Sequence, residues 1–186
     1  EIASCLVGSE MCIRDRDMDV RFPIGELELP NKVTLVDVKQ WMSEVETYID
    51  QLKNVVDDLS DEQLTKKYRE GSWTVRQLVH HIADSQMQLF SRLKLALTEE
   101  HPSAPEFDQN QWVDLADSSL PIEISIQLLD ALNQRVVAIG ENVSNSDLER
   151  KVNLEGTDDL TVAFLLAKLS WHERHHLEHI KIALSN

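Results

Sequence analysis

The chain has 186 residues, of which 42% are hydrophobic, so it can bury the core of one domain and is too short to suggest two. A net charge of −15 and a pI near 4.8 argue against binding to nucleic acid or to an anionic membrane surface through clustered basic residues. No apolar run approaches the roughly 20 residues of a membrane-spanning helix. We therefore expect a cytoplasmic protein without signal peptide or membrane anchor, whose partner is a small molecule.

The first sixteen residues have neither helical nor strand periodicity, and they contain both cysteines, Cys5 and Cys12. They read EIASCLVGSEMCIRDR, a string that resembles a translated sequencing adapter. We therefore expect residues 1–17 to be non-native or disordered, and a single domain over residues 18–186 that begins at Met18. Without cysteines, that domain has no thiolate ligand, cysteine nucleophile or disulfide.

Four long segments carry apolar residues at helical spacing, and none shows the alternation of a half-buried strand. The first segment covers about 34–59 and is followed by a short turn at Ser60. The second begins at Thr74, where Gln77 completes a capping box, and it runs to about 100. The third follows Pro121 and ends near Gly140, and the fourth covers about 161–184.

The connection between the second and third segments is long, and it contains Phe107 and Trp112. Aromatic residues in a long connection favour one that packs over the domain. The sequence therefore predicts an all-α fold, a four-helix bundle with a long loop between helices 2 and 3. Such bundles often hold metal sites between facing helices.

All histidines except His101 lie in two short stretches inside predicted helices, VHHIAD at 79–84 and WHERHHLEHI at 171–180. Turning each helix by about 100° per residue shows which side chains point inward. In the second helix His81 borders the apolar face, whereas His80 points to the polar side. In the fourth helix His172 and His176 lie at the border of the apolar face, one turn apart.

A second pair with the same spacing, His175 and His179, is shifted toward Lys168, and we prefer His172 and His176 as the inward pair. His80, His175 and His179 then orient the other histidines or lie at the surface, and His101 caps a helix end. A single helical histidine, or an isolated HxxxH pair, is more often structural than a ligand. The prediction of a metal site rests on the combination of both helices.

Two imidazoles at i and i+4, with a third from a facing helix, give a metal three protein ligands and leave positions open. We therefore predict that His81, His172 and His176 bind one divalent metal ion per chain. A ligand set of nitrogens alone fits zinc, nickel, iron or a similar transition metal, and it disfavours calcium and magnesium.

Three motifs are familiar: YREGSWTVRQLVHHIADS at 68–85, RLKLALTEEHP at 92–102 and WHERHHLEHI at 171–180. With RFPIGEL at 21–27 and PIEISIQLLDAL at 121–132, they make the chain resemble the DinB-like superfamily and its YfiT-type branch. That branch comprises metal-dependent hydrolases and bacillithiol S-transferases. The resemblance implies a four-helix bundle, often homodimeric, with one zinc or nickel ion per subunit. It assigns the ligands to His81, His172 and His176, which helical phase also selects.

The chain departs from the family pattern near the predicted site. Gln86 and Gln88 stand where relatives often read DSHMN, and Asn153-Leu154 replaces a frequent His-Pro before the last helix. These departures leave the three histidines intact, and they weaken the transfer of pocket chemistry from relatives.

Two enzymatic functions fit the predicted site. In the first, the metal activates a low-molecular-weight thiol, similar to bacillithiol, for S-transfer to an electrophilic small molecule. In the second, the metal activates water for hydrolysis. Asp84, one turn after His81, and Glu173, inside the apolar face, are candidate acid–base groups. A buried carboxylate more often pairs with a basic side chain, and we prefer that structural interpretation for Glu173.

A third possibility is a non-catalytic bundle, in which the metal joins two helices or is sensed. In that case protein ligands should fill all four positions around the ion, for example with Glu173 or His179 as the fourth. Only three inward histidines are evident, which favours catalysis. Gln88 and Arg92 continue the His81 side of the second helix, where they either line the pocket or form its solvated edge.

Overall fold

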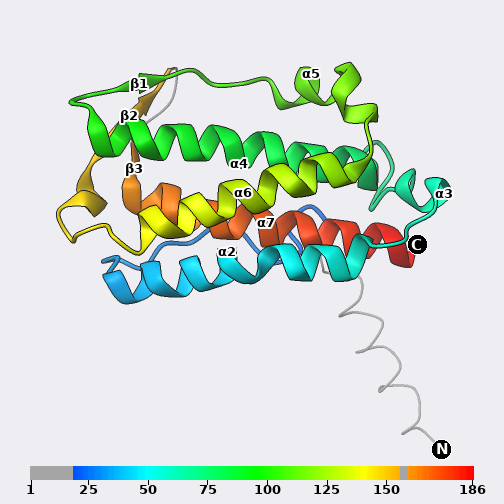
Figure 1. The fold of residues 1–186 in the computed structure, drawn as a ribbon, viewed down its shortest axis with the longest axis horizontal. Helices are drawn as coiled ribbons and strands as arrows, with labels where there is room; N and C mark the ends of the chain where they lie inside the picture. Colours follow the sequence, from blue (N-terminus) through cyan, green and yellow to red (C-terminus); the bar gives the residue numbers. More distant parts are fainter. Residues whose placement is uncertain (1–18, 156–158) are drawn as a thin grey trace, which may run out of the picture.

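Our computed structural model describes residues 19–155 and 159–186. In these residues four long helices form a bundle: α2 (Leu35–Val56), α4 (Val75–Thr98), α6 (Ile122–Gly140) and α7 (Val162–Ser185). The prediction of an all-α four-helix bundle is confirmed (Figure 1). The interpretation of residues 1–17 and of the two cysteines lies outside the described residues.

The bundle is closed by four neighbouring pairs of helices: α4 with α7, α2 with α7, α4 with α6, and α2 with α6. Figure 1 shows by colour that α2 and α7 run in one direction along the bundle, whereas α4 and α6 run in the other. Two parallel helices in sequence need a long return connection, which explains the length of the segment between α4 and α6. Because α4 is adjacent and antiparallel to α7, the two histidine stretches can meet.

Side-chain caps define where most of the helices begin. Thr34, Ser60 and Thr74 each accept a hydrogen bond from the backbone amide three residues later, and in each case that residue bonds back to the cap. The capping box at Ser60 starts the short helix α3 (Asp61–Leu64). The capping box predicted at Thr74 and the short turn predicted at Ser60 are therefore confirmed.

The core extends along the whole bundle. Large side chains that are almost completely buried come from every long helix, and they include Leu52, Leu78, Leu93, Leu129 and Leu165. Among the described residues, no helix combines the length and the apolar character that crossing a membrane requires.

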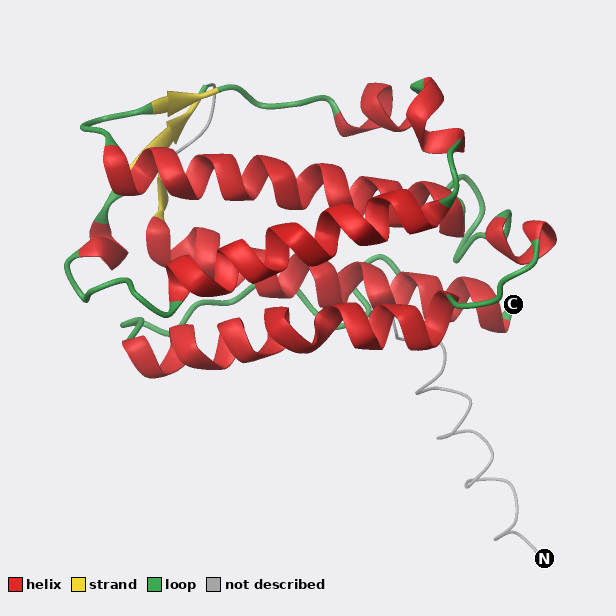
Figure 2. Cartoon of the chain, in the orientation of Figure 1, coloured by secondary structure: helices red, strands yellow, loops and turns green. Residues whose placement is uncertain are grey.

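One end of the bundle carries a small sheet that the sequence did not predict (Figure 2). Strand β1 (Ser103–Ala104) pairs in parallel with β2 (Lys151–Leu154), which pairs antiparallel with β3 (Asp159–Thr161). Strands of two to four residues are too short for an alternating pattern to stand out. In β2 the pattern is nevertheless present, because Val152 and Leu154 are buried and their neighbours are exposed.

The long connection also contains α5 (Gln109–Val113) and the 3₁₀ turn η1 (Ala116–Ser119), and both contact α4. The rings of Phe107 and Trp112 pack against each other with centroids 4.9 Å apart. The expectation that this connection packs over the bundle is confirmed, and it places α5 above the beginning of α4 (Figure 1).

Candidate metal centre

The three predicted ligands lie together between α4 and α7. The ring centroid of His81 is 5.1 Å from that of His172 and 4.9 Å from that of His176. One nitrogen from each ring lies within 4.8 Å of the others, and all three side chains are buried. The structure thus brings together the residues that helical phase selected, while metal binding by them stays a prediction.

The spacing of the two α7 histidines fits a shared metal ion. Their Nε2 atoms are 3.1 Å apart. With metal–nitrogen bonds of about 2.0–2.1 Å, two ligand nitrogens lie about 2.9 Å apart at a right angle and about 3.4 Å apart at a tetrahedral angle. Two imidazole nitrogens at 3.1 Å are therefore positioned as in one coordination sphere, and the donor set suits a transition metal.

All three rings are held in the neutral form that a metal requires. Burial lowers the pKa of His81 to about 4, with a smaller contribution from His175. Burial, followed by the charge of the neighbouring histidines, lowers the pKa values of His172 and His176 well below 6.5. At neutral pH each ring therefore keeps one nitrogen lone pair that can bind a metal, although Nε2 of His81 lies 3.4 Å from Oγ of Ser85.

A chain of hydrogen bonds fixes which nitrogen of His176 carries the proton. The carbonyl of Val20 can only accept, so His179 donates from Nε2, at 2.9 Å. The neutral ring of His179 then accepts at Nδ1, which lies 3.1 Å from Nδ1 of His176. His176 must donate there, and its Nε2 lone pair is left facing His172. His179 thus orients His176, as partners of metal-bound histidines commonly do.

A second group of histidine nitrogens, from His175, His176 and His179, also lies within 4.8 Å. In this group the Nδ1 atom of His176 is already bonded to His179. The ring of His175 instead stacks on Trp171, with centroids 4.4 Å apart. We therefore favour the first group, which uses the free Nε2 of His176.

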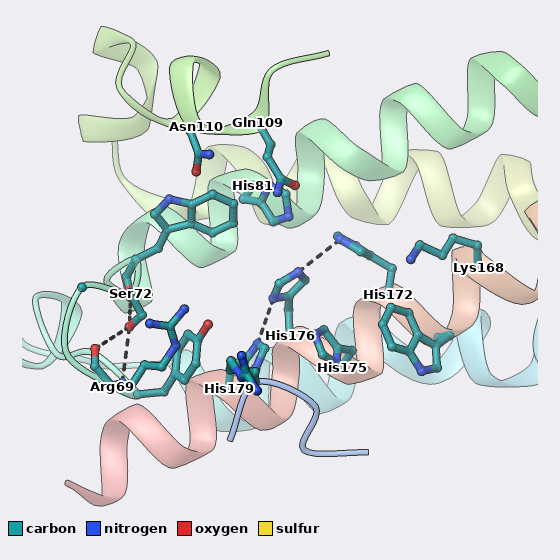
Figure 3. Close-up of a pocket in the computed structure, with 15 residues that line it drawn as sticks. Arg69, Ser72, His81, Gln109, Asn110, Lys168, His172, His175, His176 and His179 are labelled. Carbon is teal, nitrogen blue, oxygen red and sulfur yellow. Dashed lines mark hydrogen bonds between the residues drawn. The ribbon is translucent and has the colours of Figure 1, made fainter. Parts of the chain in front are cut away.

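A cavity of about 360 Å³ opens beside the three histidines. Its walls come from Arg21, from the loop 68–73, from α4, from α5 and from α7. Figure 3 shows Gln109 and Asn110 on one side of the histidines and Arg69 on the other. The cavity can admit a small molecule to the open side of the centre. Among the described residues that line it, none is an aspartate or a glutamate.

Glu173, one of the two candidate acid–base residues, does not line this cavity. It is completely buried, and it accepts a hydrogen bond of 2.7 Å from Nδ2 of Asn133. Burial raises its pKa well above 4.5, against a smaller lowering by the Asn133 hydrogen bond, and the net shift favours the neutral acid. The structure gives Glu173 an amide partner in place of the basic side chain that we expected.

Gln86, one of the departures from the family pattern, belongs to the same buried network. Its Nε2 donates to Oδ1 of Asn133 at 2.8 Å, and Nδ2 of Asn133 also donates to the carbonyl of Val45 at 3.3 Å. The network joins α4, α6, α7 and α2 through polar contacts. Gln86 thus has a structural role away from the cavity.

Asp84, the other candidate acid–base residue, also lies outside the cavity lining. Burial, with a smaller contribution from Asp117, raises its pKa to about 6. Gln88 and Arg92 do not line the cavity either. Arg92 is buried and donates to the carbonyl of Pro105 at 3.0 Å, so it anchors the long connection.

The structure corrects the placement of His80. This residue is buried between α4 and the segment that leads into α6, not exposed on a polar face. Its Nε2 donates to the carbonyl of Leu120 at 2.8 Å, and its Nδ1 lies 2.6 Å from Oγ of Ser125. Both nitrogens are used, so His80 has no lone pair for a metal. His101 is exposed with φ +50°, beyond the end of α4, and Glu99 is the cap residue there.

Several cavity residues escaped prediction because they lie outside regular helices or on the edge of one. The ring of Trp73 lies 4.4 Å from that of His81, and Tyr68 stacks on His179 at 4.0 Å. Both residues come from the loop just before α4, where no periodic pattern indicates which way a side chain points. The motif that covers 68–85 was the available signal, since it extends well upstream of the histidines.

Comparisons with known proteins agree with this architecture. Residues 44–180 match the DinB superfamily. A protein of Oceanobacillus iheyensis, named as a candidate metal-dependent hydrolase, is 52% identical over 91% of this chain and 98% of its own length. A protein of Halalkalibacterium halodurans with the same kind of name is 38% identical over 90% of this chain and 98% of its own.

Solved structures show the same fold. YfiT from Bacillus subtilis, described as a probable metal-dependent hydrolase with an unusual four-helix bundle topology, is 34% identical with a TM-score of 0.83. The match covers 87% of this chain and 94% of YfiT. A mycothiol-dependent maleylpyruvate isomerase, at 15% identity and a TM-score of 0.55, shares the fold over 78% of this chain and 60% of its own. This chain belongs to the DinB superfamily.

Proposed function

We propose that this protein is a metal-dependent enzyme that transfers a low-molecular-weight thiol, similar to bacillithiol, to electrophilic small molecules. The observation that carries the proposal is the cavity itself, in which three inward histidines meet an open space whose described lining contains no carboxylate. His81, His172 and His176 would hold a divalent metal, zinc or nickel in our expectation. When bound, that metal supplies positive charge that lowers the pKa of a coordinated thiol or water.

The cavity lining favours a thiol over water. A free thiol has a pKa of about 8.5, so a modest electrostatic shift ionises it at neutral pH without a separate base. Hydrolysis of an ester or amide also requires a group that delivers a proton to the leaving group. Asp84 and Glu173 are the carboxylates that we considered for this work, and both lie outside the cavity lining.

Aromatic residues of the cavity wall shape the space in which this reaction would occur. The closely packed rings of His175 and Trp171 narrow the cavity on the α7 side, and Trp73 covers His81. In the proposed reaction these aromatic walls would shield the thiol from water on their side and limit the orientations of the electrophile. With monochlorobimane as the electrophile, a sulfur–carbon bond forms, chloride leaves with the bonding electrons, and the thiol proton passes to solvent.

The second candidate function is metal-dependent hydrolysis, which the names of the relatives favour. One experiment compares the two. Purified protein is assayed with a panel of thiols plus monochlorobimane, and beside it with ester and amide substrates, each with and without a chelator. We expect chelator-sensitive thiol transfer; chelator-sensitive turnover of esters or amides alone would instead establish the hydrolase.

A further inference from the structure

We propose that the substrate carries a carboxylate, which is bound by Lys168 beside the histidine centre. This inference rests on the proposed function in one respect, that the cavity beside the histidines is where the substrate binds. It adds the charge of the substrate and the residue that recognises it.

The charge of the cavity is opposite to that of the chain. The protein has 33 acidic and 18 basic residues, so fifteen residues drawn from its composition would include about three acidic ones. The described lining has none, and it contains Arg21, Arg69 and Lys168. An acidic protein that keeps one concave surface free of carboxylates provides a local site for anions.

The three cations differ in how far their charge is compensated. Arg21 is paired with Asp19 through several hydrogen bonds, the shortest 2.7 Å, so its charge is largely neutralised. Arg69 is exposed, and its guanidinium donates a hydrogen bond of 3.2 Å to the backbone carbonyl of Glu70. Among the described residues, neither Arg69 nor Lys168 forms an ion pair.

Lys168 is the cation placed to bind a substrate near the centre. It is partly buried and lies one turn before His172, and Figure 3 shows its ammonium group beside that ring. The ammonium lies 4.3 Å from the ring centroid of Trp171, which holds it by a cation–π contact. Removing an ammonium from water without an anionic partner is unfavourable, and a carboxylate in the cavity would supply that partner.

The number of charges points to a single carboxylate near the centre. One partly buried ammonium matches one negative charge, whereas a doubly charged phosphate would require further donors. Arg69 lies on the other side of the histidines, at the exposed rim, and stacks over Tyr68 at 5.5 Å (Figure 3). At such a position a charge mainly increases the association rate, and salt screens its effect.

The test uses two thiols that differ in one charge, 3-mercaptopropionate and its methyl ester. Binding of each to the metal-loaded protein is measured by calorimetry without an electrophile, and turnover is measured with monochlorobimane. We expect the wild-type protein to bind the carboxylate thiol about tenfold more tightly than the ester. Lys168→Met should remove this preference, whereas Lys168→Arg, which keeps the positive charge, should retain most of it.

Matched controls come from two cations that lie outside the cavity lining. Lys94 and Arg135 also lie over an aromatic ring, that of Phe90, and neither lines the cavity. Lys94→Met and Arg135→Met should therefore keep the preference of the wild type. Metal content and melting temperature, measured for every variant, identify any loss of metal or of folding.

The outcomes separate this inference from the proposed function. Equal binding of both thiols by the wild type, or an unchanged preference in Lys168→Met, would overturn the role of Lys168. Preferential binding of the carboxylate thiol without any turnover would support the anion site and contradict the proposed thiol transfer.

Discussion

At the scale of single residues, the metal centre depends on hydrogen bonds as much as on its three ligands. His179 accepts at Nδ1 because its other nitrogen is bonded to Val20, and this leaves Nε2 of His176 free. We therefore expect His179→Ala to weaken metal affinity about 10- to 100-fold, because His176 loses the partner that fixes its tautomer. Competition with a chromogenic chelator measures this change. Wild-type affinity in the variant would show that the hydrogen bond does not orient His176.

The ligand assignment itself is tested by His172→Ala. We expect the purified protein to contain about one equivalent of metal per chain, and the variant to lose most of it, because two nitrogens alone bind a divalent ion weakly. Mass spectrometry of the intact and digested protein gives the ratio of metal to protein chain. His101→Asn is the matched control, since His101 does not line the cavity beside the three histidines and asparagine tolerates its positive φ. Full metal content in His172→Ala would refute the assignment.

Glu173 offers a prediction that separates a structural from a catalytic role. Because its carboxyl is neutral and bonded to Asn133, Glu173→Gln keeps the shape and the hydrogen bond. We expect this variant to retain metal and activity, whereas Glu173→Ala should lose about 2–4 kcal/mol of unfolding free energy through a cavity and an unpaired amide. Denaturant titration measures the unfolding free energy of each variant, and metal content and turnover are measured separately. A large loss of activity in a folded, metal-loaded Glu173→Gln would indicate a catalytic role.

At the scale of helices and strands, the sequence was sufficient wherever a pattern repeats over several turns. The four long helices and the inward direction of His81, His172 and His176 follow from helical periodicity and from capping residues. The short strands and the cavity loop could not be predicted, because two to six residues contain no repeat. His80 was misplaced for another reason: the long connection covers the polar side of α4, a tertiary contact that no helical wheel includes.

The cap of α4 holds the helix that carries His81, and Thr74 forms it together with Gln77. We expect Thr74→Ala to reduce the unfolding free energy by about 1 kcal/mol, with a smaller effect on metal affinity, because the rest of α4 stays packed. Thermal and denaturant unfolding measure the change in unfolding free energy. Thr98→Ala, at the other end of the same helix, is the control and should change stability less.

At the scale of the whole molecule, burial makes stability depend on pH with a definite sign. Burial lowers the pKa values of six histidines: His80, His81, His172, His175, His176 and His179. As the pH falls below about 6.5 the unfolded chain binds these protons more readily than the folded chain, down to about pH 4 for His81 and His175, so stability rises with pH in this range. The raised pKa values of Glu173 and Asp84 act in the opposite direction, from fewer groups.

We therefore expect the metal-free protein to lose stability steadily as the pH falls from 6.5 to 4. Melting temperatures across this range, in buffers of equal ionic strength, measure the trend. Bound metal should steepen it, because protons compete for the same lone pairs. A flat profile, or one that rises on acidification, would show that the carboxylates outweigh the histidines.

The arrangement of the helices also sets the order in which the protein can mature. Two of the three predicted ligands lie on α7, the last of the described helices, and the third lies about 90 residues earlier on α4. A growing polypeptide on the ribosome therefore holds a single ligand until α7 emerges and docks. Metal acquisition should therefore wait until α7 has emerged and docked against α4, so a metal-loaded molecule is one in which these two helices have already packed together.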